Sequence, residues 1–433
     1  MTCKRNVPLA GAAVPHSAIS RRGLIVAPAA FIVAAGGPAG EGSGRFGRIT
    51  DYFASETARK WIPGAVAMIA RHGEIVYQAA FGLRDPATGA PMRTDSIFRI
   101  YSMTKPVTGV AVLMLMEAGK IRLDDPISNY LPELAQMKVA VETLDAQGRR
   151  LVSLVAAERE ITIEDLLCHT SGITYGGGDS AAEQAMRQAG MGIQLGRGDG
   201  NPMSVRMTDR QAVEAIGKLP LKFQPGSAWE YGRSTDVLLA LVEAVSGQQG
   251  DVFMQERIFG PLGMTDTFFN VPAEKLDRVA QPGADPETGE TADLTDVTRT
   301  RRFLGGGEGL LSTASDYMRF ALMLASGGEG NGVRLLSRET VALMTSDHLG
   351  PGLAQGPDFM PGPDYGFGLT VEVRTRAGTP GNVGEFGWSG AAGTEFRVDP
   401  KDALVAILMI QAPRQGGFVQ SAFRDLAYRA IGD

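Results

Sequence analysis

The chain has 433 residues, of which 44% are hydrophobic and 21% charged, and its formal net charge is −6. This hydrophobic content can build a large core, while the lack of a cluster rich in Lys and Arg excludes nucleic acid as an expected partner. The 56 glycines and 24 prolines exceed average usage without forming a period, which is typical of a loop-rich enzyme and not of a repeat protein.

Neither the cysteines nor the histidines form a metal-binding pattern. Cys3 and Cys168 are the only cysteines, so no disulfide framework and no Cys-based metal site can be built. The four histidines show no H-x-x-x-H pair and no nearby carboxylates at metal-ligand spacing. We therefore predict no metal and no other cofactor.

Residues 1–43 differ in composition from the rest of the chain. A basic stretch without acidic residues ends at Arg21 and Arg22, and an apolar run follows over 23–35. This order resembles a twin-arginine export leader, which would make the mature protein periplasmic or exported. A disordered extension of a cytoplasmic protein remains the alternative. The apolar run is shorter than the about 20 residues that a membrane span needs, and no later segment is a candidate span.

From residue 44 onward, strand patterns lie near both ends of the chain and helices lie mostly between them. The predicted elements are a helix over 49–60, strands over 64–70, 75–79, 366–373, 394–398 and 403–410, and a helix over 419–430. Strands at both ends around a helical middle imply one sheet with an inserted subdomain. The predicted fold class is α/β, with an antiparallel sheet and flanking helices in one domain over 44–433. Its sheet part covers about 44–125 and 320–433, and its helical part about 126–319.

A buried helix is predicted directly after Ser102. Apolar residues cover nearly all sides of the segment 107–118, with Pro106 near its start and Gly119 past its end. The spacing of three residues puts Lys105 on the same face as Ser102. A helix-capping serine followed by a solvated lysine is the ordinary alternative. A lysine at the mouth of so apolar a helix is costly to desolvate unless it has a partner or loses its proton, and an unprotonated lysine can activate a serine.

Two later segments complete a recognisable set. Tyr231 lies in a predicted loop-to-helix junction within 223–247, and Trp388 lies in a Gly-rich strand edge over 384–396. With Ser102 and Lys105, these segments resemble the S-x-x-K, Y-x-N and K-T-G motifs of serine β-lactamases and penicillin-binding proteins, in that order. The sequence segments 166–172, 259–267 and 305–317 are also similar to segments of that superfamily. The resemblance therefore covers nearly all of 44–433.

The resemblance is strongest to class C β-lactamases and to family VIII carboxylesterases, which often carry W-x-G in place of K-T-G. It implies a β-lactamase/transpeptidase-like α+β fold and a serine hydrolase that forms an acyl-enzyme. Ser102 would be the nucleophile, with Lys105 and Tyr231 as a proton relay. The backbone N–H groups of Ser102 and Ala391 would form the oxyanion hole. The substrate-binding residues would be Trp388, Gly390 and Arg233, and a salt-bridged surface residue is the open alternative for Arg233.

Two departures from the superfamily motifs favour an ester over a β-lactam. Arg233 stands where Y-x-N has its Asn, and Trp388 stands where K-T-G has its Lys. A donor to the lactam side-chain amide and a cation near the lactam carboxylate are thus both missing. We predict a small-molecule ester substrate with a short acyl chain. A β-lactamase, a D-amino-acid peptidase and an acyltransferase on the same site remain open, and the oligomeric state is not predicted.

Two rival assignments of the chemistry fit the sequence less well. An α/β-hydrolase would need a G-x-S-x-G elbow followed by an acid and a histidine, and neither 232–236 nor 387–391 fits that motif. A non-enzymatic ligand sensor of the same fold conflicts with the intact Ser102, Lys105 and Tyr231. His169, in the Thr-Ser-Gly turn at 169–172, is expected to order that loop as a hydrogen-bond donor and not to act as a base.

Overall fold

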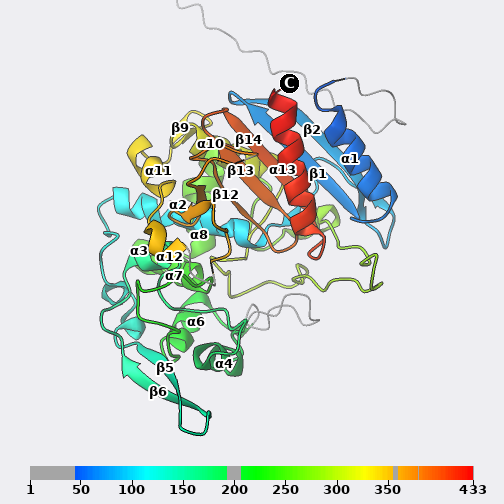
Figure 1. Ribbon diagram of the computed structural model, residues 1–433. Helices are drawn as coiled ribbons and strands as arrows, with labels where there is room; N and C mark the ends of the chain where they lie inside the picture. The colour runs from blue at the N-terminus through cyan, green and yellow to red at the C-terminus, as the bar shows by residue number, and fades with distance from the viewer. Residues whose placement is uncertain (1–43, 193–205, 355–358, 379, 433) are drawn as a thin grey trace, which may run out of the picture. The chain divides into compact units, whose positions relative to one another are not determined.

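One antiparallel sheet of eight strands joins the two ends of the part of the chain that the structure describes. The computed structural model describes residues 44–192, 206–354, 359–378 and 380–432, so the leader predicted for 1–43 lies outside the described residues. The strand order is β10-β11-β12-β13-β14-β1-β2-β3 (Figure 1). The strands are β1 (Gly64–Arg71), β2 (Glu74–Asp85), β3 (Ala90–Pro91), β10 (Tyr365–Phe367), β11 (Glu372–Arg374), β12 (Phe386–Ser389), β13 (Glu395–Asp399) and β14 (Leu404–Ile410).

Three two-stranded sheets accompany the main sheet. They pair β4 (Phe98–Arg99) with β7 (Leu311–Ser312), β5 (Lys138–Leu144) with β6 (Arg150–Ala156), and β8 (Glu329–Gly330) with β9 (Val333–Arg334). The first of these lies directly before the segment that carries Ser102.

The central strand β1 shows why the sheet is covered on both sides. Its residues 64–70 are all buried, and because successive side chains point to opposite faces, the strand feeds two separate cores. Val66 and Met68 pack into the larger core with the central helices. Ala67 and Ile69 pack into a second core with the two terminal helices. A continuous apolar run in this antiparallel strand is therefore the mark of a sheet buried between two layers.

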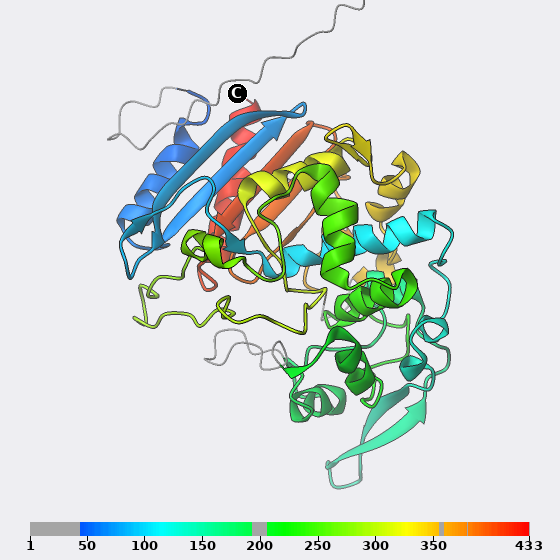
Figure 2. The same cartoon turned by 180° about the vertical axis from the view of Figure 1, so that it is seen from behind.

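Helices cover the two faces of the sheet in different ways. The terminal helices α1 and α13 pack together on one face, and α10 packs on the other face against β1, β13 and β14 (Figures 1 and 2). The helices are α1 (Gly47–Ala58), α2 (Thr104–Glu117), α3 (Ile163–Leu167), α4 (Ala181–Gln188), α6 (Asp209–Ile216), α7 (Ser234–Ser246), α8 (Gly250–Met254), α9 (Gly260–Leu262), α10 (Ala314–Ala325), α11 (Arg338–Met344), α12 (Gly350–Ala354) and α13 (Gly416–Gly432).

Short turns of other helical types are η1 (Tyr101–Met103), η2 (Ile127–Asn129), η3 (Pro132–Leu134), η4 (Gln255–Phe259) and η5 (Ala273–Arg278), of which η4 is a π-helix. As the sequence predicts, α2 is buried along most of its length, and it packs against α7. Among the described residues, no helix combines the length and the apolarity that crossing a bilayer requires.

The predicted α/β fold class with an antiparallel sheet is confirmed. One predicted strand, 366–373, is wrong as a continuous element, since the chain forms β10 and then β11 with a break between them. Thr370 lies in the break with φ of 73°, a left-handed conformation that an extended strand does not contain.

Candidate active site

A tight turn presents Ser102 ahead of α2. The chain leaves β4 and enters the turn η1, so Ser102 lies two residues before the first residue of α2 and does not open the α-helix itself. Tyr101, directly before Ser102, has φ of 42°. This backbone conformation is energetically unfavourable for residues other than glycine, and it recurs at functional sites. Its hydroxyl accepts a hydrogen bond from the Thr295 N–H at 3.2 Å. Tertiary contacts therefore hold the strained turn.

Lys105 is fully buried and its amine contacts three oxygen atoms. Nζ lies 3.2 Å from Ser102 Oγ, 3.1 Å from Tyr175 Oη and 2.7 Å from the Gly307 carbonyl oxygen. The carbonyl can only accept, so one N–H always points to Gly307. An ammonium would donate to all three oxygens, whereas a neutral amine would have its lone pair available for one of the hydroxyls. The geometry thus suits a group that exchanges a proton with Ser102.

A glycine-rich loop over 304–309 holds the Gly307 carbonyl in place. Asp236 accepts from the Gly307 N–H at 2.8 Å, and Asp209 accepts from the N–H groups of Leu304 at 2.9 Å and Gly305 at 3.0 Å. A Cβ on Gly309 would lie 1.7 Å from the Leu304 carbonyl oxygen, so a side chain there would break the loop. Burial is the main reason that the pKa of Asp209 is raised to about 7.

Sequence reasoning did not find Tyr175. Its hydroxyl contacts Lys105, and its pKa is raised well above the usual value by burial first and by the charge of Asp236 second. Tyr175 therefore remains a neutral phenol that positions Lys105. Its only sequence signal is its place three residues after the Thr-Ser-Gly turn, and that spacing does not by itself indicate a contact with Lys105.

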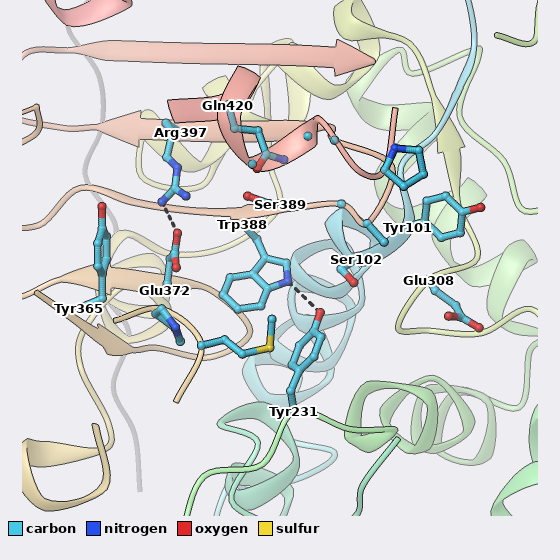
Figure 3. Close-up of a pocket in the computed structure, with 18 of the residues that line it drawn as sticks. Tyr101, Ser102, Tyr231, Glu308, Tyr365, Glu372, Trp388, Ser389, Arg397 and Gln420 are labelled. Carbon is cyan, nitrogen blue, oxygen red and sulfur yellow. Dashed lines mark hydrogen bonds and ion pairs between the residues drawn. The ribbon is translucent and has the colours of Figure 1, made fainter. Parts of the chain in front are cut away.

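Tyr231 and Trp388 meet beside Lys105. The amine lies 4.5 Å from the centre of the Tyr231 ring, and the Trp388 indole N–H donates to Tyr231 Oη at 3.1 Å (Figure 3). Trp388 comes from β12, and Tyr231 precedes α7, so two distant segments meet here. The indole occupies one lone pair of the tyrosine oxygen and would stabilise negative charge on it.

Gly390 lets the end of β12 approach the Ser102 turn closely. A Cβ at this position would lie 2.4 Å from the Ile100 carbonyl oxygen and 2.2 Å from Thr394 Oγ1. Ser102, Trp388, Gly390 and Ala391 consequently line the same cavity. The structure thus brings the two predicted oxyanion-hole residues, Ser102 and Ala391, to one wall.

Arg233 does not lie in this cavity. It is fully buried, forms an ion pair with Asp236 at 3.0 Å and donates to the Met191 carbonyl at 2.8 Å. The expectation that Arg233 contacts substrate is therefore not met, because the side chain turns into the protein toward a carboxylate three residues along. Its role is to anchor Asp236, which in turn holds Gly307.

His169 is also placed differently from the expectation. Within the described residues neither ring nitrogen has a hydrogen-bond partner, so the predicted loop-ordering hydrogen bond is absent there. Its pKa is held well below the usual value by burial first and by the Lys105 charge second. The neutral ring packs against Tyr231 with 5.0 Å between ring centres, and this contact helps to fix the position of the tyrosine side chain.

The cavity has a volume of about 540 Å³ and extends well beyond Ser102. Its far end, defined here as Tyr365, Glu372, Arg397, Gln420 and Arg424, is rich in ion pairs (Figure 3). Arg397 pairs with Glu372 and, at 2.9 Å, with Glu395. No sequence pattern indicates this end, because its residues come from four separate elements, β10, β11, β13 and α13.

One group of potential metal ligands occurs among the described residues. Ligand atoms of Glu164, Cys168 and His348 lie within 4.8 Å of one another. His348 Nδ1 already contacts Glu164 at 2.8 Å, and burial raises the pKa of the Cys168 thiol well above its usual value. None of the three lines the cavity, so this group takes no part in the site.

The fold and this cavity agree with what comparison with known proteins shows. A family model described as Beta-lactamase matches residues 49–430. The chain is 36% identical over 362 residues to Protein Rv1367c of Mycobacterium tuberculosis (strain H37Rv), covering 81% of this chain and 86% of that protein. It is 32% identical over 405 residues to Esterase EstB of Burkholderia gladioli, covering 88% and 94%.

A solved structure shows the same relationship. The structure described as EstCE1, a hydrolase with promiscuous acyltransferase activity, has a TM-score of 0.72 at 26% identity and covers 89% of this chain and 98% of that chain. The chain therefore belongs to the β-lactamase family and is a serine hydrolase of that family. The predicted superfamily is confirmed.

Proposed function

We propose that this protein hydrolyses carboxylic esters with short acyl chains through an acyl-enzyme on Ser102. The observation that carries the proposal is the contact between Lys105 Nζ and Ser102 Oγ at 3.2 Å, since Ser102 lines a cavity whose wall also holds Trp388 in place of a cation. The esterase EstB supports the ester chemistry, as it shares 32% identity with this chain.

In the first step, Ser102 Oγ attacks the ester carbonyl carbon while its proton passes to the neutral amine of Lys105. The carbonyl oxygen takes up negative charge, which the N–H groups of Ser102 and Ala391 stabilise. The bond from the carbonyl carbon to the alcohol oxygen then breaks. The alcohol leaves with the Tyr231 hydroxyl proton, and Lys105 returns its proton to Tyr231.

In the second step, a water molecule attacks the acyl carbon and gives one proton to the Lys105 and Tyr231 pair. The bond to Ser102 Oγ breaks, the serine recovers its proton, and the carboxylic acid leaves. Trp388 assists both steps in the same way, since its indole N–H stabilises charge on the Tyr231 oxygen.

The charges along the cavity wall favour an uncharged substrate at the reacting end. A β-lactam carries a carboxylate close to its scissile amide, and Trp388 offers that carboxylate an indole and no ammonium. The arginines that line the cavity, Arg397 and Arg424, both contact Glu395. Since Arg233 is buried elsewhere, no substitute cation comes from that residue.

Acyl transfer to an alcohol or amine is a second candidate. The cavity extends from Ser102 to α13, which leaves space for an acceptor beside the acyl-enzyme. The EstCE1 structure, described as a hydrolase with promiscuous acyltransferase activity, supports this candidate. A β-lactamase and a D-amino-acid peptidase would use the same residues on other substrates.

The deciding experiment measures kcat/KM for a short-chain p-nitrophenyl ester, a chromogenic cephalosporin and a D-alanyl peptide, with and without an alcohol acceptor. We expect the ester to exceed the cephalosporin at least about a hundredfold, which corresponds to about 2.7 kcal/mol of transition-state stabilisation. Equal rates for the cephalosporin and the ester would establish the lactamase instead. An ester product that forms faster with the acceptor than the acid forms would establish the transferase.

A fluorophosphonate label tests the nucleophile separately. We expect the adduct on Ser102 alone, and Ser102→Ala should remove both the adduct and the turnover. Ser389 is the informative rival because it lines the same cavity. An adduct on Ser389, Ser171 or Ser234 would refute the assignment.

A further inference from the structure

The hairpin formed by β5 and β6 exposes an unusual amount of apolar surface. Its strands pair over 138–144 and 150–156, and both views show the hairpin extending away from the neighbouring helices (Figures 1 and 2). Six of the 13 exposed large hydrophobic residues of the described chain lie on it, which makes it the main apolar patch. They are Val141, Leu144, Leu151, Val152, Leu154 and Val155, which are 37% to 71% exposed.

Both faces of this hairpin are apolar. Residues directly opposite each other share a face, so Leu154 with Ala140 and Val152 with Glu142 lie on one face. Leu151 and Val155 lie on the other face. A hairpin that covers a core has one polar and one apolar face, and every residue of β6 is exposed. The apolar side chains of β6 therefore do not serve the core of this chain.

The outer edge of β6 is open for pairing. In the described residues β6 pairs with β5 alone, whereas the outer edge of β5 is partly covered by the Leu221 backbone. Natural edge strands are usually protected by charged side chains, a proline or a bulge. The stretch 150–156 has no proline and pairs regularly with β5, and its one charged residue, Arg150, lies at its end and pairs with Glu142 of its own hairpin. An unprotected edge of this kind is a template for another strand.

The sequence of β6 is complementary to itself. It reads Arg150-Leu-Val-Ser153-Leu-Val-Ala156, so an antiparallel pair of two copies centred on Ser153 places Leu151 opposite Val155 and Val152 opposite Leu154. Every apolar side chain then meets an apolar one. Arg150, which pairs with Glu142 of its own hairpin at 3.2 Å, lies opposite Ala156 of the other copy, so the pairing places no two arginines opposite each other. A two-fold interface requires a surface of this self-complementary kind.

We propose that β6 is a homodimer interface, at which two copies of this chain pair antiparallel about Ser153 to form a four-stranded sheet. Exposed apolar side chains that gather on one element usually mark an interaction site, and pairing about Ser153 places the four apolar side chains of β6 beside those of a second copy. None of the residues that line the cavity lies within 138–156, so the interface is separate from the candidate active site.

Charge placed at the two-fold axis tests this register. Ser153 is exposed and contacts only the Val141 carbonyl of its own hairpin, at 3.5 Å, so substitution there spares the fold. Ser153→Lys puts two ammonium groups opposite each other, and Ser153→Glu puts two carboxylates there. Each variant alone should be monomeric, with dimerisation weakened at least about tenfold, while an equimolar mixture should form a heterodimer. Thr143→Lys, an exposed position on β5, is the matched control that should remain dimeric.

The measurement is sedimentation equilibrium of the full chain over a range of micromolar concentrations, with thermal melts to verify that each variant is folded. A dimeric wild type, monomeric Ser153 variants and a dimeric mixture would support the proposal. A monomeric wild type would overturn it, including the case in which the hairpin binds a different protein. A Ser153→Lys variant that remains dimeric, or a mixture that remains monomeric, would also overturn it.

Discussion

The two ends of the cavity differ in the groups that surround their basic side chains. Next to the Ser102 end, the buried amine of Lys105 makes its hydrogen bonds to uncharged oxygen atoms. At the far end, Arg397 is matched with carboxylates: burial lowers its pKa, but Glu372 and Glu395 outweigh burial and raise it well above the usual value. Arg397 is a fixed positive charge within a group of carboxylates, whereas the Lys105 amine lies within hydrogen-bond distance of the serine hydroxyl. We interpret the Ser102 end as the place of chemistry and the far end as a place of recognition.

Removing either member of the proposed relay should give the largest effect. Lys105→Ala and Tyr231→Phe should each lower kcat at least about a hundredfold, the usual scale of general acid–base catalysis. The double variant should be little worse than either single one, because groups that act as a unit lose their effect together. Steady-state rates with a p-nitrophenyl ester measure both. Strictly additive losses would place the two residues in independent roles.

The loop over 304–309, which holds Lys105 through Gly307, should make the free energy of unfolding depend on pH. The pKa of Asp209 is raised to about 7, so the folded state holds this proton more tightly than the unfolded state. Its stabilising contribution is complete below the ordinary carboxyl pKa and is lost as the pH rises through about 7. Against Asp209→Asn, the wild type should lose unfolding free energy by up to about 1.4 kcal/mol per pH unit over this window.

Urea unfolding of both proteins between about pH 5 and pH 8 measures this slope. A difference between wild type and variant that is the same at every pH would show that Asp209 does not titrate in the window. Glu243 and Asp236 contribute to the raised pKa, so the variant removes the titrating group and leaves its charged neighbours in place.

Trp388→Phe should have a smaller effect that is confined to turnover. It removes the N–H donor to Tyr231 and keeps an aromatic wall, so kcat should fall about tenfold with little change in KM, as expected for one hydrogen bond of about 1.4 kcal/mol. Trp229→Phe is the matched control. Trp229 stacks on Tyr231, but its indole N–H has no partner among the described residues, so kcat should stay within about twofold of the wild type. Equal losses in the two variants would assign the effect to packing.

Tyr365→Phe should give the smallest effect and is the far-end counterpart of Tyr231→Phe. The Tyr365 hydroxyl accepts from Arg374 at 2.6 Å and from Arg424 at 3.3 Å, so its removal alters recognition and leaves the proton path intact. We expect KM to change by up to about threefold at constant kcat, which indicates altered ground-state binding. A large loss of kcat in this variant would contradict the interpretation that the far end takes part in recognition and not in the chemical step.

Local sequence patterns predicted the parts of the site that depend on local geometry. The contact between Ser102 and Lys105 follows from residues three positions apart at a helix start, and the buried α2 follows from its apolar composition. Tyr231 and Trp388 were found through the family resemblance. For Arg233 a substrate contact and a salt-bridged surface position were both open, and its partner, Asp236, is visible three residues along at the start of the same helix. The structure shows the ion pair, in a buried position.

What the sequence did not reveal depends on tertiary contacts. Tyr175 meets Lys105 across 70 positions of the chain, and the far end gathers residues from four separate elements. The positive φ of Tyr101 and of Thr370 is uncommon for residues other than glycine. No pattern predicts such a backbone, because packing around the residue imposes it. The break between β10 and β11 was missed for this reason.

The pairing of β1 with β14 has a consequence for the order in which the protein matures during synthesis. β1 and Ser102 are made early, whereas β12, Ala391 and β14 are made last. A nascent chain on the ribosome therefore carries Ser102 long before it carries Ala391, and it also lacks the strand that closes the sheet. Contacts this distant in sequence form slowly. The hydrolase activity of the protein should consequently appear only after chain release, so partly synthesised copies remain inactive.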